Sequence, residues 1–308
     1  MMNSNTRQSP QSEEYICIIE PPPGSSSLSS LADSLDTQWV SLSGEQVIVA
    51  TANSAWLYKS PTCQNASRYS QFMRDTDGSV HSTQNLLDAA IAAAYYRYSE
   101  ATLPALTIGR WIWQLAGHYH LTCLTPQLMR TVAQEFTAGD RTVLANWAQL
   151  KARRERGYNR TTIEDIEYLG YNAQAVVAEF YPEQVANLLE YLQAGATSDP
   201  LRFLGYSFTI ERIATRIEQE YIQLATGILP PSLTCITEPH YRPWLYGSVG
   251  VDAGDVQETL EVVSRLSAGE RTRVAQACYA TAQICFQSAH LGTIADWQTK
   301  PILNCLKR

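Results

Sequence analysis

The stretch STQNLLDAAIAAAYYRY at residues 82–98 decides the fold class of this 308-residue chain. Its apolar side chains recur at the i, i+4, i+7, i+8 and i+11 positions that form one face of an α-helix, and they are Leu87, Ile91, Ala94, Tyr95 and Tyr98. The same helical period returns in most of the chain that follows. We therefore expect an all-α fold for this part of the protein.

Start and stop signals divide the rest of the chain into further helices. Thr125 and Pro126 form a cap and first-turn pair that predicts the start of a helix ending at Gly139. A helix over 140–157 follows, and Thr161 or Thr162 is expected to cap a short helix that ends at Gly170. No repeat of 20 to 50 residues is visible, so residues 82–300 are expected to form one non-repeating helical bundle.

The N-terminal part of the chain has a different composition. Residues 1–35 are polar and rich in linker residues, and we expect them to be disordered. Residues 36–81 are expected to form a small β appendage, because the β-branched runs 39–42 and 47–51 flank a short turn and predict a hairpin. Extended chain laid on the helical body is the alternative for this segment.

Composition excludes several classes of function. A net charge of −7 argues against nucleic acid and anionic membranes as partners. No signal peptide and no run of 18 apolar residues is visible, and the seven cysteines contain no C-x-x-C pair. These features predict a cytoplasmic protein with reduced thiols. The basic cluster at Lys151, Arg153, Arg154 and Arg156 is expected to be a solvated helix face.

Three segments carry acidic residues on helices that we expect to share one bundle. Glu155 and Tyr158 are spaced i and i+3, so they point the same way if they lie on one helix. Glu211 lies among apolar residues of a later helix, where a lone carboxylate is costly. Asp252 and Asp255 are also i and i+3, and two carboxylates at that spacing repel unless a cation or a proton lies between them.

The order and spacing of these segments resemble the heme-oxygenase-like fold, specifically its iron-containing redox branch of diiron oxidases and oxygenases. That branch is distantly related to the thiaminase and PQQ-synthesis proteins. The resemblance covers roughly residues 84–290. Its most telling stretch is Glu155-Arg-Gly-Tyr-Asn, followed by Asp165 and by Leu169-Gly170. The family usually has Glu-x-Gly-His-Asp there, and then a short helix that ends in Leu-Gly.

The resemblance implies a metal site with carboxylate and histidine ligands from three helices. Three positions of this chain match the family's carboxylate ligands, namely Glu155, Glu211 and Asp252. Three others stand where the family has histidines, namely Tyr158, Ser248 and Asp255. The candidate metal ligands are therefore oxygen donors only: Glu155, Glu211, Asp252, Asp255 and Tyr158. Such a set resembles a hard-cation site more than an oxygen-activating iron site.

Two functional hypotheses follow from the resemblance and stay open at this point. The first is an iron- or manganese-dependent oxidase or oxygenase that acts on a small organic substrate in a remodelled site. The second is a non-catalytic or ligand-binding relative that has no metal cofactor. In either case four carboxylates need a metal, protons or arginine side chains such as Arg212 to lie close together. The pair His118-x-His120 is not expected to bind one metal, because the two side chains point to different faces of a helix.

Overall fold

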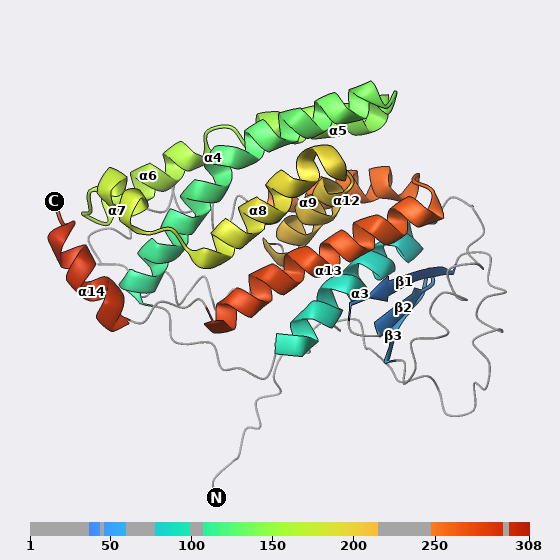
Figure 1. Cartoon of the computed structure of the whole chain (residues 1–308), viewed down its shortest axis with the longest axis horizontal. Coiled ribbons are helices and arrows are strands. Elements are labelled where there is room, and N and C mark those ends of the chain that lie inside the picture. The colour runs from blue at the N-terminus through green and yellow to red at the C-terminus, as the bar shows by residue number, and fades with distance from the viewer. Residues whose placement is uncertain (1–36, 44–45, 60–77, 99–106, 215–247, 292–295) are drawn as a thin grey trace, which may run out of the picture.

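The computed structural model describes residues 37–43, 46–59, 78–98, 107–214, 248–291 and 296–308. These residues form a bundle of α-helices with a three-stranded sheet at one end (Figure 1). The expectation of a mostly helical fold is confirmed, whereas the expected disorder of residues 1–35 lies outside the described residues. No helix in the described part of the chain has both the length and the apolar character needed to cross a lipid bilayer.

The sheet is an antiparallel meander of three short strands. Strands β1 (Gln38–Leu42), β2 (Gln46–Ala50) and β3 (Ala55–Lys59) follow one another in space as they do in the sequence. Trp39 pairs with Val49, which confirms the expected hairpin between the first two strands. The third strand was not expected, because its sequence AWLYK is short and lies just before a stretch rich in turn residues.

The sheet packs directly on helices α3 (Val80–Tyr98) and α13 (Ala268–Leu291) and shares their hydrophobic core. The buried Gln38 side chain joins the two layers, because its Nε2 donates to Ser82 Oγ at 2.6 Å and its Oε1 accepts from Arg271 Nε at 2.9 Å. Leu87, Ile91 and Ala94 of α3 are buried as expected, whereas Tyr95 is exposed. The sheet is therefore a layer of the same core as the bundle.

Helix α4 (Ile108–Ala138) is continuous through Pro126, so the expected helix start at Thr125 and Pro126 is wrong. Proline removes one backbone donor from a helix. In the preceding turn two hydroxyl groups donate to the carbonyl oxygens four residues earlier, Thr122 Oγ1 to His118 O at 2.8 Å and Thr125 Oγ1 to Leu121 O at 2.7 Å. Packing of α4 against helices on both sides keeps it intact across the proline.

The segment after α4 departs from the expected single helix over 140–157. Helix α5 (Thr142–Arg154) ends before Glu155, and helix α6 (Tyr158–Tyr168) starts after Gly157, whose φ is 96°. Glu155 and Tyr158 consequently do not share one helix, and the spacing argument for them is wrong. The expected cap at Thr161 or Thr162 is also wrong, since both lie inside α6. The end at Gly170, with φ 85°, is confirmed.

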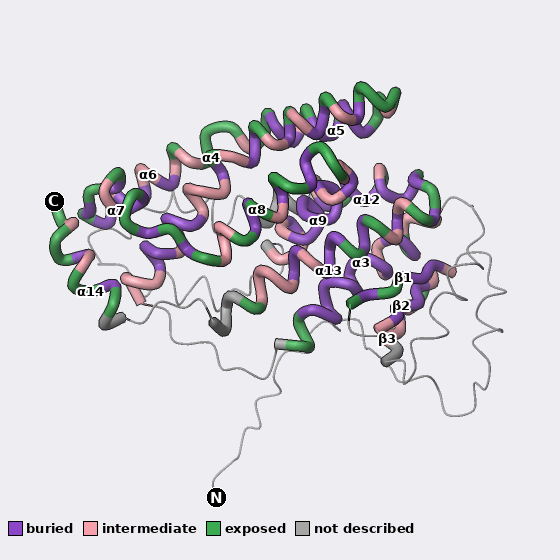
Figure 2. The backbone as a smooth tube through the Cα atoms, viewed as in Figure 1, coloured by how far each residue is buried: buried purple, intermediate pink, exposed green. Residues whose placement is uncertain are grey.

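The remaining described helices complete the bundle. They are α7 (Ala173–Glu179), α8 (Glu183–Ser198), α9 (Arg202–Ala214), α12 (Ser248–Ser264) and α14 (Asp296–Cys305). Two hydrophobic clusters hold them together, and α4 contributes to both (Figure 2). The larger cluster joins the sheet, α3, α5, α8, α9, α12, α13 and the C-terminal half of α4. The smaller one joins the N-terminal half of α4 with α6, α7 and α14.

Candidate functional site

A buried lysine lies at the centre of the acidic residues that the sequence singled out. Lys151 is only 2% exposed, and its Nζ lies 2.5 Å from Glu211 Oε1 and 3.3 Å from Asp255 Oδ2. The three side chains come from α5, α9 and α12, so the helices converge as the candidate site requires. The ammonium group places one positive charge between two carboxylates that would otherwise repel each other.

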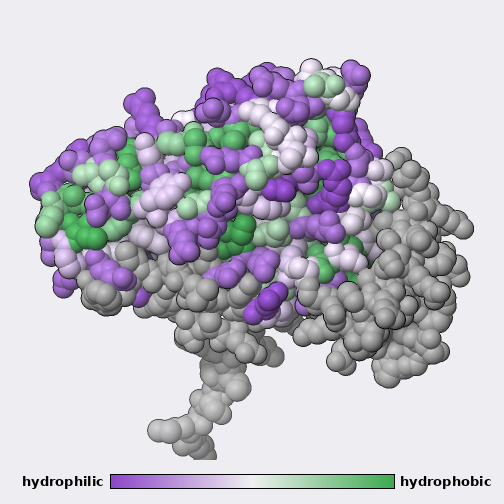
Figure 3. All heavy atoms as spheres, in the orientation of Figure 1, coloured by the Kyte–Doolittle hydropathy of each residue, from purple (hydrophilic) through white to green (hydrophobic). Residues whose placement is uncertain are grey.

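The sequence of α5 explains why this lysine is buried. Leu144, Ala148, Lys151 and Ala152 recur at helical spacing, and all four are buried against the rest of the bundle. The four-carbon stem of lysine can cross this apolar layer and carry its charge to a polar group beyond it. The expectation that the whole basic cluster is a solvated face is therefore wrong at Lys151, although the other members are exposed. Figure 3 shows a largely hydrophilic edge over α5.

Glu211 uses only one of its two carboxylate oxygens within the described part of the structure. Oε1 accepts from Lys151 Nζ at 2.5 Å and from Ser207 Oγ at 2.7 Å. Oε2 is buried and has no hydrogen-bond donor among the described residues. Burial raises the pKa of Glu211, and the Lys151 ammonium and the Ser207 hydroxyl oppose that shift. The site thus contains an inward-facing acceptor atom that still lacks a donor.

Asp255 connects this buried pair to the protein surface. Arg154 Nη1 donates to an Asp255 oxygen and also to Glu258 Oε2, which lies 2.6 Å away. The charged side chains therefore form a chain from the buried Glu211 to the partly exposed Glu258. Three carboxylates face two cations in this chain, which leaves an excess of one negative charge.

Tyr206 of α9 lies beside the same acidic residues, with its side chain 6% exposed. Burial raises the pKa of the Tyr206 hydroxyl above its ordinary value, and the negative charges of Glu155 and Glu211 add to the rise. A hydrogen bond with Thr125 of α4 acts in the opposite direction. Tyr206 therefore remains a neutral hydroxyl group close to two of the predicted metal ligands.

The structure brings together only some of the predicted ligands. Glu211 and Asp255 meet at Lys151, as described above. Glu155 follows the last residue of α5 and is half-buried, whereas Tyr158 opens α6 and is 37% exposed. Asp252 belongs to α12, but its side chain lies outside the described part of the structure. Arg212, expected as a possible partner for these carboxylates, instead forms a two-bond ion pair with Asp88 of α3.

The described donors do not fit a metal ion. No group of three or more histidine, cysteine, aspartate or glutamate side chains with suitable geometry occurs within the described residues. Where Glu211 and Asp255 approach each other, the Lys151 ammonium already contacts both, and a cation repels a metal ion that would use the same oxygen atoms. This arrangement supports neutralisation by lysine, which sequence reasoning did not consider.

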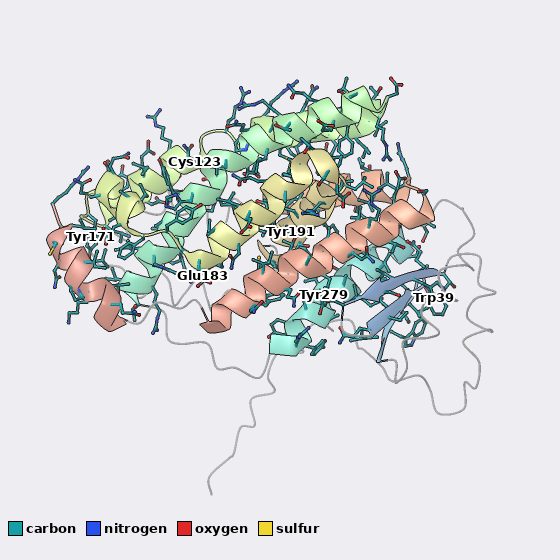
Figure 4. The ribbon with its side chains drawn as sticks, in the orientation of Figure 1. Trp39, Cys123, Tyr171, Glu183, Tyr191 and Tyr279 are labelled. Carbon is teal, nitrogen blue, oxygen red and sulfur yellow. The ribbon has the colours of Figure 1, made fainter. Side chains whose placement is uncertain are left out.

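The histidines and cysteines have separate environments. His118 Nδ1 lies 2.9 Å from Thr162 Oγ1, while His120 Nε2 lies 3.0 Å from the carbonyl oxygen of Phe180, so the two rings serve different contacts. Burial raises the pKa of the Cys278 thiol to about 12, as it does for Cys285. Cys123, on the exposed side of α4 (Figure 4), accepts from Asn159 Nδ2 at 3.4 Å. The two buried thiols, Cys278 and Cys285, are therefore not activated nucleophiles.

Lys151 is the site residue that sequence reasoning missed. Its signal was present, because it continues the buried stripe of Leu144 and Ala148 by three residues. Comparison of the chain with models of protein families, with curated proteins and with solved structures found no match.

Proposed function

We propose that this chain is a divergent, non-catalytic relative of the heme-oxygenase-like iron-containing redox proteins. It binds a small organic molecule beside the Lys151 centre, without a metal. The observation that carries this proposal is the Lys151 ammonium, which lies 2.5 Å from Glu211 and 3.3 Å from Asp255 at 2% exposure. The family's metal would need the Glu211 carboxylate that Lys151 contacts, and a histidine where this chain has Asp255.

The electrostatics of the site favour a ligand that carries an ammonium group or another N–H donor. The charged chain from Glu211 to Glu258 keeps an excess of one negative charge, and Glu211 Oε2 is a buried acceptor without a donor in the described residues. A buried acceptor without a donor is costly, so a bound N–H group would stabilise the folded protein. The adjacent Tyr206 supplies an aromatic face and a neutral hydroxyl.

Metal analysis tests the metal-free part of the proposal. The protein is purified without chelators, reconstituted anaerobically with Fe²⁺ or Mn²⁺, desalted and analysed by inductively coupled plasma mass spectrometry. We expect far less than one equivalent of either metal. The variant Lys151→Ala, which removes the ammonium and keeps the carboxylates, should retain more metal than the unmodified chain.

One equivalent of iron or manganese in the unmodified chain would contradict the proposal. It would support instead the metal-dependent, O2-using oxidase or oxygenase with a carboxylate-rich site. Equally low metal content in the unmodified chain and in Lys151→Ala would mean that the Lys151 ammonium is not what prevents metal binding. That result would contradict the role of Lys151 in the proposal.

A thermal-shift experiment tests ligand binding. The probes are primary alkylammonium ions of increasing chain length and the alcohols of matching length. We expect the ammonium ions to raise the melting temperature more than the alcohols, and Glu211→Gln to abolish the difference. Glu190→Gln, which changes an exposed carboxylate on α8 away from these charged side chains, is the matched control. Equal shifts for both probe series, or an unchanged difference in Glu211→Gln, would contradict the proposed ligand class.

A further inference from the structure

The Ser207 hydroxyl of α9 is a buried part of the charged centre. Its Oγ lies 2.7 Å from Glu211 Oε1, one helical turn later on the same helix, and the residue is 5% exposed. Serine hydroxyls within helices commonly donate to the carbonyl oxygen of the preceding turn. A carboxylate only accepts hydrogen bonds, so Ser207 donates its single proton to the Glu211 side chain instead.

Two donors therefore converge on one oxygen atom of Glu211. Lys151 Nζ lies 2.5 Å from Oε1, whereas Oε2 is buried and has no donor among the described residues. A carboxylate offers about two acceptor positions on each oxygen. The ammonium and the hydroxyl use the positions on Oε1 and leave those on Oε2 unused.

Two neighbouring carboxylates use both of their oxygens. Arg212 of α9 donates to Asp88 from Nε to Oδ1 at 2.8 Å and from Nη2 to Oδ2 at 2.6 Å. Asp255 contacts Arg154 through Oδ1 and Lys151 through Oδ2. A buried acceptor without a donor is costly, so the one-sided contact of Glu211 needs a specific cause.

Lys151 by itself does not explain the one-sided contact. Its ammonium group is anchored by Asp255 Oδ2 at 3.3 Å, but it carries three donors and can contact both oxygens of one carboxylate. The last torsion of a glutamate side chain is soft, so rotation of the Glu211 carboxylate would bring Oε2 to the ammonium at little cost. Ser207 opposes this rotation, because it holds Oε1 from within α9.

We propose that Ser207 is a positioning residue of the ligand site: by holding Oε1 it keeps Glu211 Oε2 turned away from Lys151 and open to an N–H group of the ligand. This inference rests on the proposed function and adds the residue that sets its preference for an N–H donor. The Tyr206 hydroxyl of the same helix takes part in a hydrogen bond with Thr125 of α4 and leaves Oε2 to the ligand. Recognition then depends on a directional hydrogen bond in addition to charge.

The variant Ser207→Ala tests this role, because it frees the Glu211 carboxylate to rotate toward Lys151. The measured quantity is the ratio of the affinities for a primary alkylammonium ion and for the alcohol of the same length, obtained from thermal-shift titrations. We expect this ratio to fall about tenfold, the factor expected when one hydrogen bond to a charged group is lost. Ser207→Thr keeps the hydroxyl and should keep the ratio.

A matched variant and a matched probe serve as controls. Ser264→Ala also removes a serine hydroxyl from a residue that is 5% exposed, but this hydroxyl donates to a backbone carbonyl of α12. It should leave the ratio unchanged. An alkyltrimethylammonium ion has the same charge as the primary ion but no N–H group, and should bind the unmodified protein more weakly. This difference should shrink in Ser207→Ala, whereas steric exclusion of the methyl groups would leave it unchanged.

A crystal structure of Ser207→Ala gives a readout that needs no ligand. We expect Lys151 Nζ to lie within hydrogen-bond distance of both Glu211 oxygens. An unchanged one-sided contact would overturn the inference, as would an unchanged affinity ratio in Ser207→Ala or a lost ratio in a Ser207→Thr protein whose hydroxyl still contacts Glu211. If the unmodified protein shows no preference for ammonium ions, the proposed ligand class fails, and the crystal structure still decides whether Ser207 sets the orientation of Glu211.

Discussion

Replacing Lys151 by methionine is the most direct test of the charged centre. The substitution keeps an unbranched side chain that is only one atom shorter, but it leaves the carboxylates of Glu211 and Asp255 without their shared cation. At separations of 2.5 and 3.3 Å, the gross attractions are about 7 and about 5 kcal/mol for an effective dielectric constant of about 20. Desolvation offsets most of this attraction, and breaking a buried pair typically costs about 3–5 kcal/mol. We expect a loss of that size in the free energy of unfolding, measured by urea denaturation at pH 7.

The free energy of unfolding that Lys151→Met loses should increase as pH rises. Burial already raises the pKa of Glu211, and Lys151 is the strongest cause that opposes the rise. Without Lys151 the pKa of Glu211 in the folded protein rises further. Protonated Glu211 therefore stabilises the fold at low pH, and this stability is lost as pH rises through the pKa of Glu211 in the folded protein. The variant should therefore approach the unmodified protein near the ordinary carboxyl pKa of about 4 and diverge from it toward neutral pH.

A double variant distinguishes two possible causes of the lost stability, the broken ion pair and the loss of side-chain packing. Lys151→Met combined with Glu211→Leu removes both charges, and Asp255 keeps its contact with Arg154. Replacing both members of a buried pair by apolar groups is often neutral, so stability should return to within about 1 kcal/mol of the unmodified protein. A loss below about 1 kcal/mol for Lys151→Met alone, as for an exposed pair, would refute the buried-charge reasoning. Additive losses in the double variant would refute it as well.

Three further predictions concern the packing that positions the site. Gly205→Ala should lower the free energy of unfolding by about 1–3 kcal/mol in a urea titration, because a Cβ there would lie 2.6 Å from the carbonyl oxygen of Val274 and 2.6 Å from the Cβ of an alanine on α13. The control is Gly254→Ala at an exposed position of α12, where a Cβ would contact nothing. It should leave the free energy of unfolding unchanged or raise it in the same titration. Arg212→Met should cost about 3–5 kcal/mol, since it strands a buried carboxylate on α3, and a cost near zero in thermal and urea unfolding would contradict that role. Gly157→Ala should cost about 1–2 kcal/mol because of its φ of 96°, and differential scanning calorimetry that shows no destabilisation would count against the strain.

The helical period predicted the fold class from local information. Leu87 and Ile91 are buried on one face of α3 as expected. Pro126 shows where local information failed. A proline is a strong local stop signal, but the packing of α4 against α5, α6 and α8 outweighs it, and this tertiary packing is not visible in the local sequence around Pro126.

The candidate site was predictable only in part for a similar reason. The resemblance selected Glu211 and Asp255, and both lie at the charged centre. Their neutralising partner, Lys151, is 60 residues from Glu211 in the sequence. The buried stripe of α5 turns Lys151 inward, but only the convergence of α5, α9 and α12 brings its ammonium group to Glu211 and Asp255. The resemblance to the heme-oxygenase-like family remains a prediction.

The hydrogen bond between Gln38 and Arg271 has a consequence for the synthesis of this protein. Its two residues are 233 positions apart, so the first described strand emerges from the ribosome long before the helix that anchors it. At a translation rate of about 5–20 residues per second, the delay is roughly 10 to 50 s. During that interval α3, the next described helix after the sheet, can already pack on the strands, but the Gln38 side chain lacks its partner on α13.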